Sequence, residues 1–221
     1  MMPSLRVPLL AAGLTAALTF SSFGLAADQP APAAPAGPST DLSAVPKATY
    51  NLDPAHTNII FVINHLGFSN MIGRFDTIGG ALDFNSKKPE KSKLTVKVDA
   101  ASVDTKVAKL DEHLKGADFF DVAKYPDIKF KSTKVEKLSD STGKITGDLT
   151  LHGVTKPVTL DVTFHGAGPH MMTKAMVLGF GAKATIKRSD FGISQYVPMV
   201  GDEVTLIIES EFDQPVPEKK S

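Results

Sequence analysis

Apolar and polar residues alternate along much of the chain. The pattern is clearest over residues 93–99, 158–165, 178–186 and 204–212, where apolar side chains at every second position are separated mostly by polar residues or glycine. Alternation with a period of two gives a β-strand one apolar and one polar face. The four segments therefore predict an antiparallel sheet with a single buried side.

Four weaker segments extend this sheet. Residues 59–63 are apolar throughout, and residues 128–130 and 145–151 alternate again. Residues 75–84 carry apolar side chains on both sides of a glycine pair, which is typical of a turn or of a close backbone approach. Together with the clearer segments, they predict about eight strands.

One segment is predicted to be helical. Its apolar residues are spaced by three and four positions, at Val107, Leu110 and Leu114. We expect Asp104 to cap the N-terminus of this helix and Gly116 to end it. Asp111 and Lys115 lie four residues apart, a spacing that favours an ion pair on one helix face.

A sheet of about eight strands with one apolar face must fold over on itself, as a sandwich or as a closed barrel. We favour the barrel because closure removes exposed edge strands. The predicted fold class is all-β with one short helix, arranged as an antiparallel β-barrel of about eight strands. The small residues Gly147, Ala182 and Ala184 recur on otherwise bulky inward faces. Periodicity alone leaves open whether they fit the taper of a filled barrel or leave a cavity for one slender ligand.

The N-terminus has the order of a secretory signal peptide. Arg6 precedes an uncharged, mainly apolar stretch over residues 7–20, and small residues follow at positions 24–27. This order predicts a cleaved signal peptide over residues 1–26. Export of a chain without cysteines favours a bacterial periplasm as its location.

The rest of the chain is predicted to hold one folded domain. Residues 27–46 are rich in alanine and proline and have no large aromatic side chain, which predicts a disordered linker. The domain is expected over residues 47–214, and a short tail follows at 215–221.

Composition and charge exclude several classes of function. The 221 residues include 24 basic and 24 acidic side chains, so the chain lacks the positive excess that favours nucleic-acid binding. The chain has no cysteine, which removes disulfides, thiolate metal sites and thiol nucleophiles. The sequence also has no Gly-x-Ser-x-Gly elbow, phosphate loop or His-Glu-x-x-His pair. We therefore expect neither an enzyme nor a bound cofactor.

The histidines are scattered singly along the chain. One of them belongs to a group that offers both imidazole and carboxylate ligands: Asp111, Glu112, His113, Asp118 and Asp121. A solvated helix face explains this group better, so no metal site is predicted. His65 and His113 each adjoin apolar residues, where a histidine is a hydrogen-bonding group of the core or a polar contact for a ligand.

Several motifs resemble those of a known family, in the same order along the chain. They include residues 50–56 (YNLDPAH), 60–68 (IFVINHLGF), 118–121 (DFFD), 147–156 (GDLTLHGVTK) and 186–192 (IKRSDFG). Over residues 49–212 the chain resembles the YceI-like lipid- and polyisoprenoid-binding domain. Thr57 stands where this family often has serine after its first histidine.

This resemblance implies a lipocalin-like barrel that is exported and holds a long apolar chain along its axis. The implied ligand is a polyisoprenoid, a quinone tail or another long-chain lipid, with no cofactor and no catalytic residues. The resemblance therefore favours a cavity over a filled barrel. Transient contact with a membrane is a further expectation, and the sequence leaves the oligomeric state open.

We predict two sets of residues for such a ligand. The candidate lining residues are apolar side chains at inward strand positions: Phe61, Ile63, Phe75, Phe84, Phe130, Leu149, Leu151, Phe164, Phe180, Leu206 and Ile208. The candidate head-group contacts are His65, His113, His152 and Arg188. Two other functions stay open, namely an envelope interaction module with a barrel filled by its own side chains and an enzyme acting around His113.

Overall fold

The structure is a computed structural model that describes residues 37–215. Its strands are β1 (Ala48–His65), β2 (Ser69–Phe75), β3 (Ile78–Phe84), β4 (Lys93–Asp99), β5 (Val103–Asp104), β6 (Asp127–Lys137), β7 (Thr142–Leu151), β8 (Val154–Pro169), β9 (Met176–Lys187) and β10 (Val200–Asp213). Its helices are α1 (Ala108–Lys115) and the short 3-10 segments η1 (Leu42–Ala44), η2 (Pro89–Lys91), η3 (Ala100–Ser102) and η4 (Arg188–Phe191). Over the described residues, none of these helices combines the length and apolar character needed to cross a bilayer.

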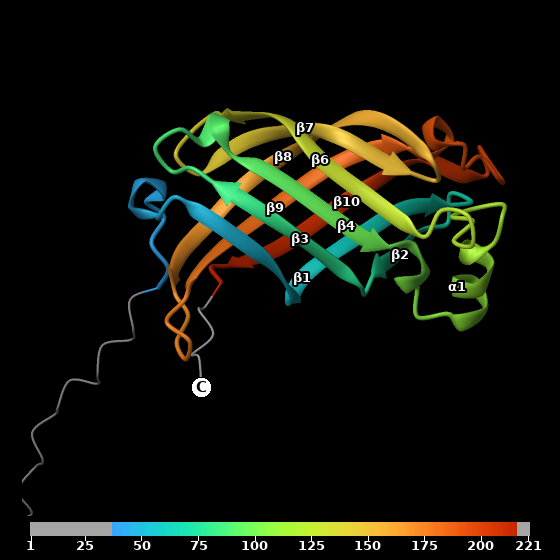
Figure 1. Cartoon of the computed structure of the whole chain (residues 1–221). Helices are drawn as coiled ribbons and strands as arrows, with labels where there is room; N and C mark the ends of the chain where they lie inside the picture. Colours follow the sequence, from blue (N-terminus) through green and yellow to red (C-terminus); the bar gives the residue numbers. More distant parts are fainter. Residues whose placement is uncertain (1–36, 216–221) are drawn as a thin grey trace, which may run out of the picture. The chain divides into compact units, whose positions relative to one another are not determined.

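The strands form one antiparallel sheet that closes into a barrel (Figure 1). The sheet follows the order β10-β9-β8-β7-β6-β4-β3-β1, and β1 pairs back onto β10 to complete a ring of eight strands. The first part of β1 pairs with β3, whereas its second part pairs with β2, which in turn pairs with β5. The predicted β-barrel of about eight strands is confirmed.

The alternating segments of the sequence lie in strands of this barrel. The four clear ones fall in β4, β8, β9 and β10, and the weaker ones fall in β1, β2 with β3, β6 and β7. The apolar residues at the inward positions are buried. Leu160 and Phe164 of β8, for example, have exposed fractions of 7% and 5%. Tyr50 and Leu178 are fully buried in the core cluster. The two-residue strand β5 is too short to leave a period-two signal.

The folded domain begins earlier than the sequence suggests. Ser39 and Ala167 exchange two backbone hydrogen bonds of 2.8 Å, and the Tyr50 hydroxyl donates to the Pro46 carbonyl at 2.8 Å. Val45 is buried in the core. The stretch 37–46 is therefore part of the domain, because its few apolar side chains find a partner surface that composition does not reveal. The predicted signal peptide, the first part of the predicted linker and the end of the tail lie outside the described residues.

Helix α1 forms where the sequence predicts it, but its start is built differently. Its N-cap is Val107, which makes no side-chain cap hydrogen bond, and Asp104 belongs to β5 instead. Asp111 turns back to accept hydrogen bonds from the Thr105 backbone N–H and hydroxyl at 2.8 and 2.6 Å. The predicted Asp111 to Lys115 pair is therefore wrong, and Lys115 pairs with Glu112 at 2.9 Å. Gly116 ends the helix as predicted.

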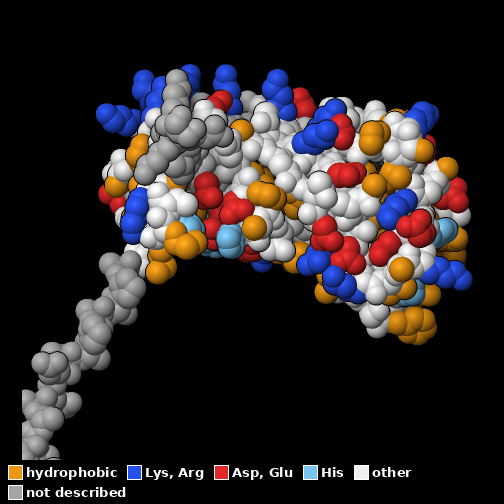
Figure 2. Space-filling view, turned by 60° about the horizontal axis from the view of Figure 1, so that its bottom comes forward, with side chains coloured by type: hydrophobic (Ala, Val, Ile, Leu, Met, Phe, Trp, Pro, Cys, Tyr) orange, Lys and Arg blue, Asp and Glu red, His pale blue; other side chains and the backbone are white. Residues whose placement is uncertain are grey.

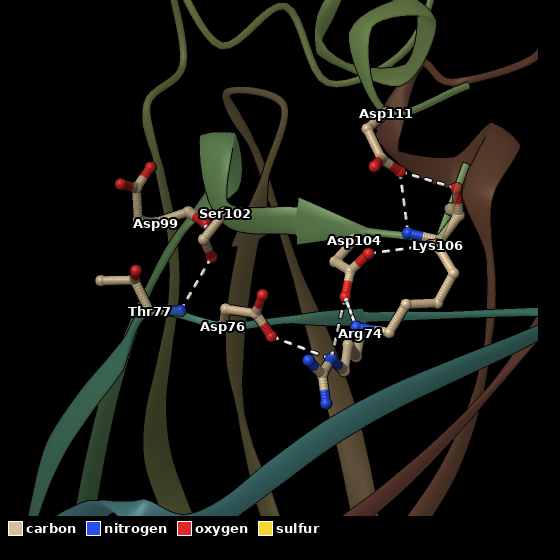
Figure 3. Close-up of polar contacts among 9 residues, drawn as sticks. Arg74, Asp76, Thr77, Asp99, Ser102, Asp104, Lys106 and Asp111 are labelled. Atoms are coloured by element: carbon tan, nitrogen blue, oxygen red, sulfur yellow. Dashed lines mark hydrogen bonds and ion pairs between the residues drawn. The ribbon is translucent and has the colours of Figure 1, made fainter. Parts of the chain in front are cut away.

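A polar network holds the segment before α1 against β2 (Figure 3). Asp104 accepts hydrogen bonds from the Lys106 backbone N–H at 2.8 Å and from Arg74 Nε at 3.2 Å. Arg74 Nε also lies 2.9 Å from an Asp76 carboxylate oxygen. Hydrogen bonds from the side chain and backbone of Lys106, with a further contribution from Arg74, lower the pKa of Asp104 to about 2. The network fixes where α1 begins.

The small residue Gly147 does not add cavity volume. A Cβ atom at this position would meet Phe130 Cζ at 2.4 Å and the Lys131 carbonyl oxygen at 2.6 Å. The Phe130 ring on neighbouring β6 therefore covers Gly147, and the glycine makes room for this ring. Of the two explanations that periodicity left open for Gly147, the structure supports close packing, because the neighbouring strand fills the space.

We expect Gly147→Ala to destabilise the barrel by about 1–3 kcal/mol, because the ring and the backbone must both move. The matched control is Gly79→Ala in β3, where an added Cβ meets no atom within 4 Å. This control should change stability by less than about 1 kcal/mol. The measurement is denaturant-induced unfolding, and equal effects of the two substitutions would contradict the packing described for Gly147.

We expect Asp104→Asn to lower stability at pH 7 and to have a much smaller effect at about pH 2. The pKa of Asp104 is depressed in the folded protein, so its ionised form stabilises the fold above the ordinary pKa of 3.8, and this contribution is lost as the pH falls toward 2. Denaturant unfolding at pH 7, 4 and 2 measures the difference. Asp148→Asn, at an exposed position of β7, is the control. A wild-type to Asp104→Asn difference that stays constant with pH would contradict this role.

Candidate functional site

The barrel encloses a cavity of about 440 Å³. This volume lies within the range of about 300–1,000 Å³ that is usual for small-molecule pockets. Side chains from all eight strands of the ring, from β2 and from α1 line it, and nearly all of the lining surface is apolar. The cavity extends from His113 and Tyr196 at the α1 end to Ser139 and Thr142 in the β6–β7 hairpin at the other end. Its length therefore follows the barrel axis.

The cavity brings together every predicted lining residue. Those residues are Phe61, Ile63, Phe75, Phe84, Phe130, Leu149, Leu151, Phe164, Phe180, Leu206 and Ile208. Ala182 also lines it, whereas Ala184 is buried outside the cavity lining. Strand alternation explains this agreement, because every second residue of a barrel strand must face the interior. Contact of these side chains with a ligand stays a prediction.

Aromatic rings make up much of the wall. The ring centroids of Phe61 and Phe75 lie 5.7 Å apart, and Phe75 continues to Phe120 at 5.5 Å. On the other side, Phe164 and Phe180 are 5.3 Å apart. Such tilted and edge-on pairs are favourable arrangements of aromatic side chains. Packed aromatic rings therefore give much of the wall an apolar surface.

Three of the four predicted head-group residues line the cavity, and one does not. His65, His113 and Arg188 belong to the lining. The His113 ring lies 4.9 Å from the Phe119 ring and 6.3 Å from the Tyr196 ring, at the α1 end. His152 lies outside the lining, where its Nδ1 is 3.1 Å from the Phe191 carbonyl oxygen. The structure therefore gives His152 a packing role, which its position next to a turn could not reveal in the sequence.

The guanidinium group of Arg188 is hydrogen-bonded to three backbone carbonyl oxygens of the protein. It donates to the carbonyl oxygens of Gly201 at 2.8 Å, Val200 at 3.0 Å and Ile193 at 3.1 Å. The side chain is 5% exposed, and this burial lowers the pKa of Arg188. Its three hydrogen bonds fasten the loop between η4 and β10 to the end of the barrel. Positioning this loop is the role that the geometry supports for Arg188.

Two hydroxyl groups in the cavity wall were not predicted. Thr57 of β1 and Ser210 of β10 both line the cavity, with exposed fractions of 6% and 9%. The pairing of β1 with β10 shifts register between Asp53 and Asn58, so residues 54–57 form a bulge. A bulge changes which side chains point inward. Thr57 keeps the inward phase of Ile59, Phe61 and Ile63, so alternation extended back along β1 would have found it. The bulge changes the phase only between Leu52 and Thr57.

The group of ionisable residues around His113 is not assembled as a metal site. Glu112 pairs with Lys115, and Asp111 is hydrogen-bonded to Thr105. Within residues 37–215, the group whose ligand atoms lie close enough to hold a metal ion is instead Asp53, His56 and Glu211. Figure 2 shows acidic and histidine side chains side by side on the surface.

Two residues of the Asp53, His56 and Glu211 group form an ion pair with each other. His56 Nδ1 lies 2.6 Å from Asp53 Oδ2, and their hydrogen bond lowers the pKa of Asp53 and raises that of His56. The sequence does not reveal this group, because Glu211 joins it only through the pairing of β1 with β10.

Several known proteins are similar to this chain in sequence and in fold. The YceI-like domain matches residues 50–212 of the chain. Protein YceI of Escherichia coli O157:H7 is 42% identical over 166 residues, which make up 74% of this chain and 86% of that protein. The crystal structure of the Campylobacter jejuni YCEI protein is 36% identical, covers 69% of this chain and 90% of its own, and has a TM-score of 0.63.

A more distant structure shares the fold alone. It is described as a polyisoprenoid binding domain from Saccharophagus degradans implicated in plant cell wall breakdown. It is 15% identical, covers 75% of this chain and 98% of its own, and has a TM-score of 0.57. The match to the YceI-like domain spans nearly the whole barrel, from Tyr50, the third residue of β1, to Phe212, the next-to-last residue of β10. This chain therefore belongs to the YceI-like domain family.

Proposed function

We propose that this protein carries a long-chain apolar lipid, such as an isoprenoid or a quinone tail, inside its barrel. The observation that carries the proposal is the cavity along the barrel axis, whose wall is apolar on nearly all sides. The description of the Saccharophagus degradans structure as a polyisoprenoid binding domain supports a ligand of this class. A barrel filled by its own side chains would suit an envelope interaction module, and the open volume of about 440 Å³ weighs against that alternative.

The energetics favour recognition of the tail. Burial of a methylene group contributes about 0.8 kcal/mol, so a five-carbon unit contributes roughly 3–4 kcal/mol relative to water. A neutral hydrogen bond to a head group contributes about 1 kcal/mol. A bilayer solvates the tail almost as well as the barrel, so transfer between membrane and protein is nearly neutral. Such a balance suits reversible exchange.

We place this exchange in the periplasm and assign no catalytic step to the protein. The charged, apolar and small-residue order of the N-terminus supports export. The histidine at the cavity end, His113, packs against aromatic rings and has no acid, base or nucleophile arranged beside it in the described hydrogen bonds and ion pairs of residues 37–215. A binding role accounts for the site without further chemistry.

We further propose that the α1 end of the barrel contacts the membrane during exchange. Exposed apolar side chains gather on the segments that form this end, and we call them the apolar rim: Leu66, Phe68, Ile72, Val107, Tyr196 and Met199. Phe68, at the tip of the β1–β2 hairpin, is 88% exposed. A concentration of exposed apolar groups is typical of an interaction surface. Its position beside the cavity end gives the lipid a short path into the barrel.

We expect Ala182→Phe to weaken lipid binding by at least about tenfold, equivalent to about 1.4 kcal/mol, because the new ring occupies the cavity. Thr185→Phe adds the same ring to the exposed face of β9 and is the matched control. Binding is measured by displacement of the fluorescent hydrocarbon diphenylhexatriene with geranylgeraniol. Denaturant unfolding verifies that both variants fold. A folded Ala182→Phe variant that binds as the wild type does would contradict binding in the cavity.

We expect Phe68→Asp to slow lipid transfer from vesicles several-fold. Contact of the apolar rim with the bilayer would then move a charged carboxylate out of water, which is unfavourable. The control is Met172→Asp, which changes an equally exposed apolar residue in the loop between β8 and β9, at the opposite end of the barrel. Transfer is followed with a fluorescent lipid in phosphatidylcholine and phosphatidylglycerol vesicles. A larger effect of Met172→Asp would place the contact at the other end.

A further inference from the structure

We propose that Thr57 and Ser210 form a polar subsite inside the barrel that selects lipids with a neutral hydrogen-bonding group, such as a hydroxyl, a carbonyl or an amide. This inference rests on the proposed lipid-binding function and narrows its ligand class. The subsite lies in the side wall of the cavity, away from the histidine at the α1 end. Such a lipid would therefore be held at a polar group as well as along its apolar tail.

The unpaired hydroxyl of Thr57 is the first observation. Its side chain is 6% exposed and lines the cavity, and Thr57 Oγ1 has no hydrogen-bond partner among residues 37–215. Buried polar atoms in native proteins are almost always hydrogen-bonded, because an unpaired one loses its bonds to water without replacement. Thr57 Oγ1 is covered by protein atoms in this structure, so a ligand with a polar group at this depth would supply the missing partner after a rotation of the side chain toward the cavity.

The strand register places Thr57 opposite Ser210. Asp53 pairs with Glu211 and Asn58 pairs with Glu209, so residues 54–57 of β1 all face the single residue Ser210 of β10. The register that pairs Ile59 with Ile208 and Asn58 with Glu209 continues to Thr57 opposite Ser210. Two hydroxyl-bearing residues thereby lie at the seam that closes the barrel. Thr57 shares the inward phase of Ile59 and Phe61, and the bulge ends this phase toward the N-terminus of β1.

Ser210 is the second member of the subsite. Its side chain is 9% exposed and lines the cavity. Its hydroxyl donates to the Phe180 carbonyl oxygen at 3.3 Å, which leaves the lone pairs of Oγ free to accept. Thr57 can donate or accept, because a hydroxyl carries one donor and two acceptor sites. The pair therefore suits a ligand hydroxyl, which does both, as well as a carbonyl or an amide.

The surroundings of the pair select against a charged group. Along the inner faces of β1 and β10, the neighbouring cavity residues are Leu52, Ile59, Ile208 and Phe212, all of them apolar. A carboxylate or phosphate beside them would lose its hydration without gaining a counterion. Arg188 supplies no compensating charge here, because its donors hold three backbone carbonyls at the α1 end. The subsite therefore favours neutral lipids.

The test compares two ligands that differ by one hydroxyl group, (Z)-9-octadecen-1-ol and (Z)-9-octadecene. Both are titrated against diphenylhexatriene bound to the full chain. In Thr57→Val the ratio of alcohol affinity to hydrocarbon affinity should fall by roughly three- to tenfold, which is the range expected for one neutral hydrogen bond. Thr57→Ser keeps the hydroxyl and should keep the wild-type ratio, and Ser210→Ala should lower it. Thr205→Val, on the exposed face of β10, is the matched control and should not change it.

A stability measurement separates ligand recognition from a structural role. Since Thr57 Oγ1 bonds to no described residue, ligand-free Thr57→Val should be at least as stable as the wild type in denaturant unfolding. A clear loss of stability would instead make the hydroxyl structural and overturn the subsite.

Other outcomes distinguish this inference from the proposed function. If the wild type binds both ligands and neither Thr57→Val nor Ser210→Ala changes their affinity ratio, the hydroxyls meet only water, and the subsite is overturned while lipid carriage stands. If the wild type binds neither ligand and releases no diphenylhexatriene, the carrier proposal fails and the subsite fails with it. If Thr57→Val does not fold, the ratio of alcohol affinity to hydrocarbon affinity is compared in Ser210→Ala and Thr57→Ser. A lower ratio in Ser210→Ala with an unchanged ratio in Thr57→Ser supports the subsite, and an unchanged ratio in Ser210→Ala overturns it.

Discussion

The pairing of β1 with β10 is the constraint on which the rest of the structure depends. It converts a twisted antiparallel sheet into a ring of eight strands, so that the apolar face of each strand is enclosed. Because β1 spans 18 residues, its later part also pairs with β2, which carries the sheet toward β5 and α1. Strand β1 therefore closes the wall through β10 and, through β2 and β5, leads to the helix at one end of the cavity.

Closure also sets the chemistry of the cavity wall. Strand alternation lines the interior with aliphatic and aromatic side chains, and such a wall offers no hydrogen bonds to polar groups. The inward phase of the later part of β1 ends at the bulge with Thr57, which lies opposite Ser210. On the outer face of the same seam, Asp53, His56 and Glu211 lie together. The irregular part of β1 thus carries polar groups on both sides of an otherwise apolar wall.

The regular parts of the structure follow from local pattern, and the irregular parts do not. A period of two is a property of each strand by itself, so the sequence identifies the strands and the inward residues such as Phe164 and Leu206. The cap of α1, the surroundings of Gly147 and the partners of Arg188 depend on segments distant in the sequence. Pattern analysis of one chain has no access to these contacts. The bulge at residues 54–57 escaped prediction for the same reason, since a bulge is defined by the partner strand.

The central claim is that the barrel holds a lipid along its axis. The most direct measurement is mass spectrometry of organic extracts from the full-length protein, expressed in a Gram-negative bacterium and purified without detergent. We predict a neutral long-chain lipid at close to one molecule per barrel in the wild type, and its strong depletion in extracts of Ala182→Phe. Repeated extracts of the wild type that contain no lipid above the level of an unrelated periplasmic protein would contradict the account.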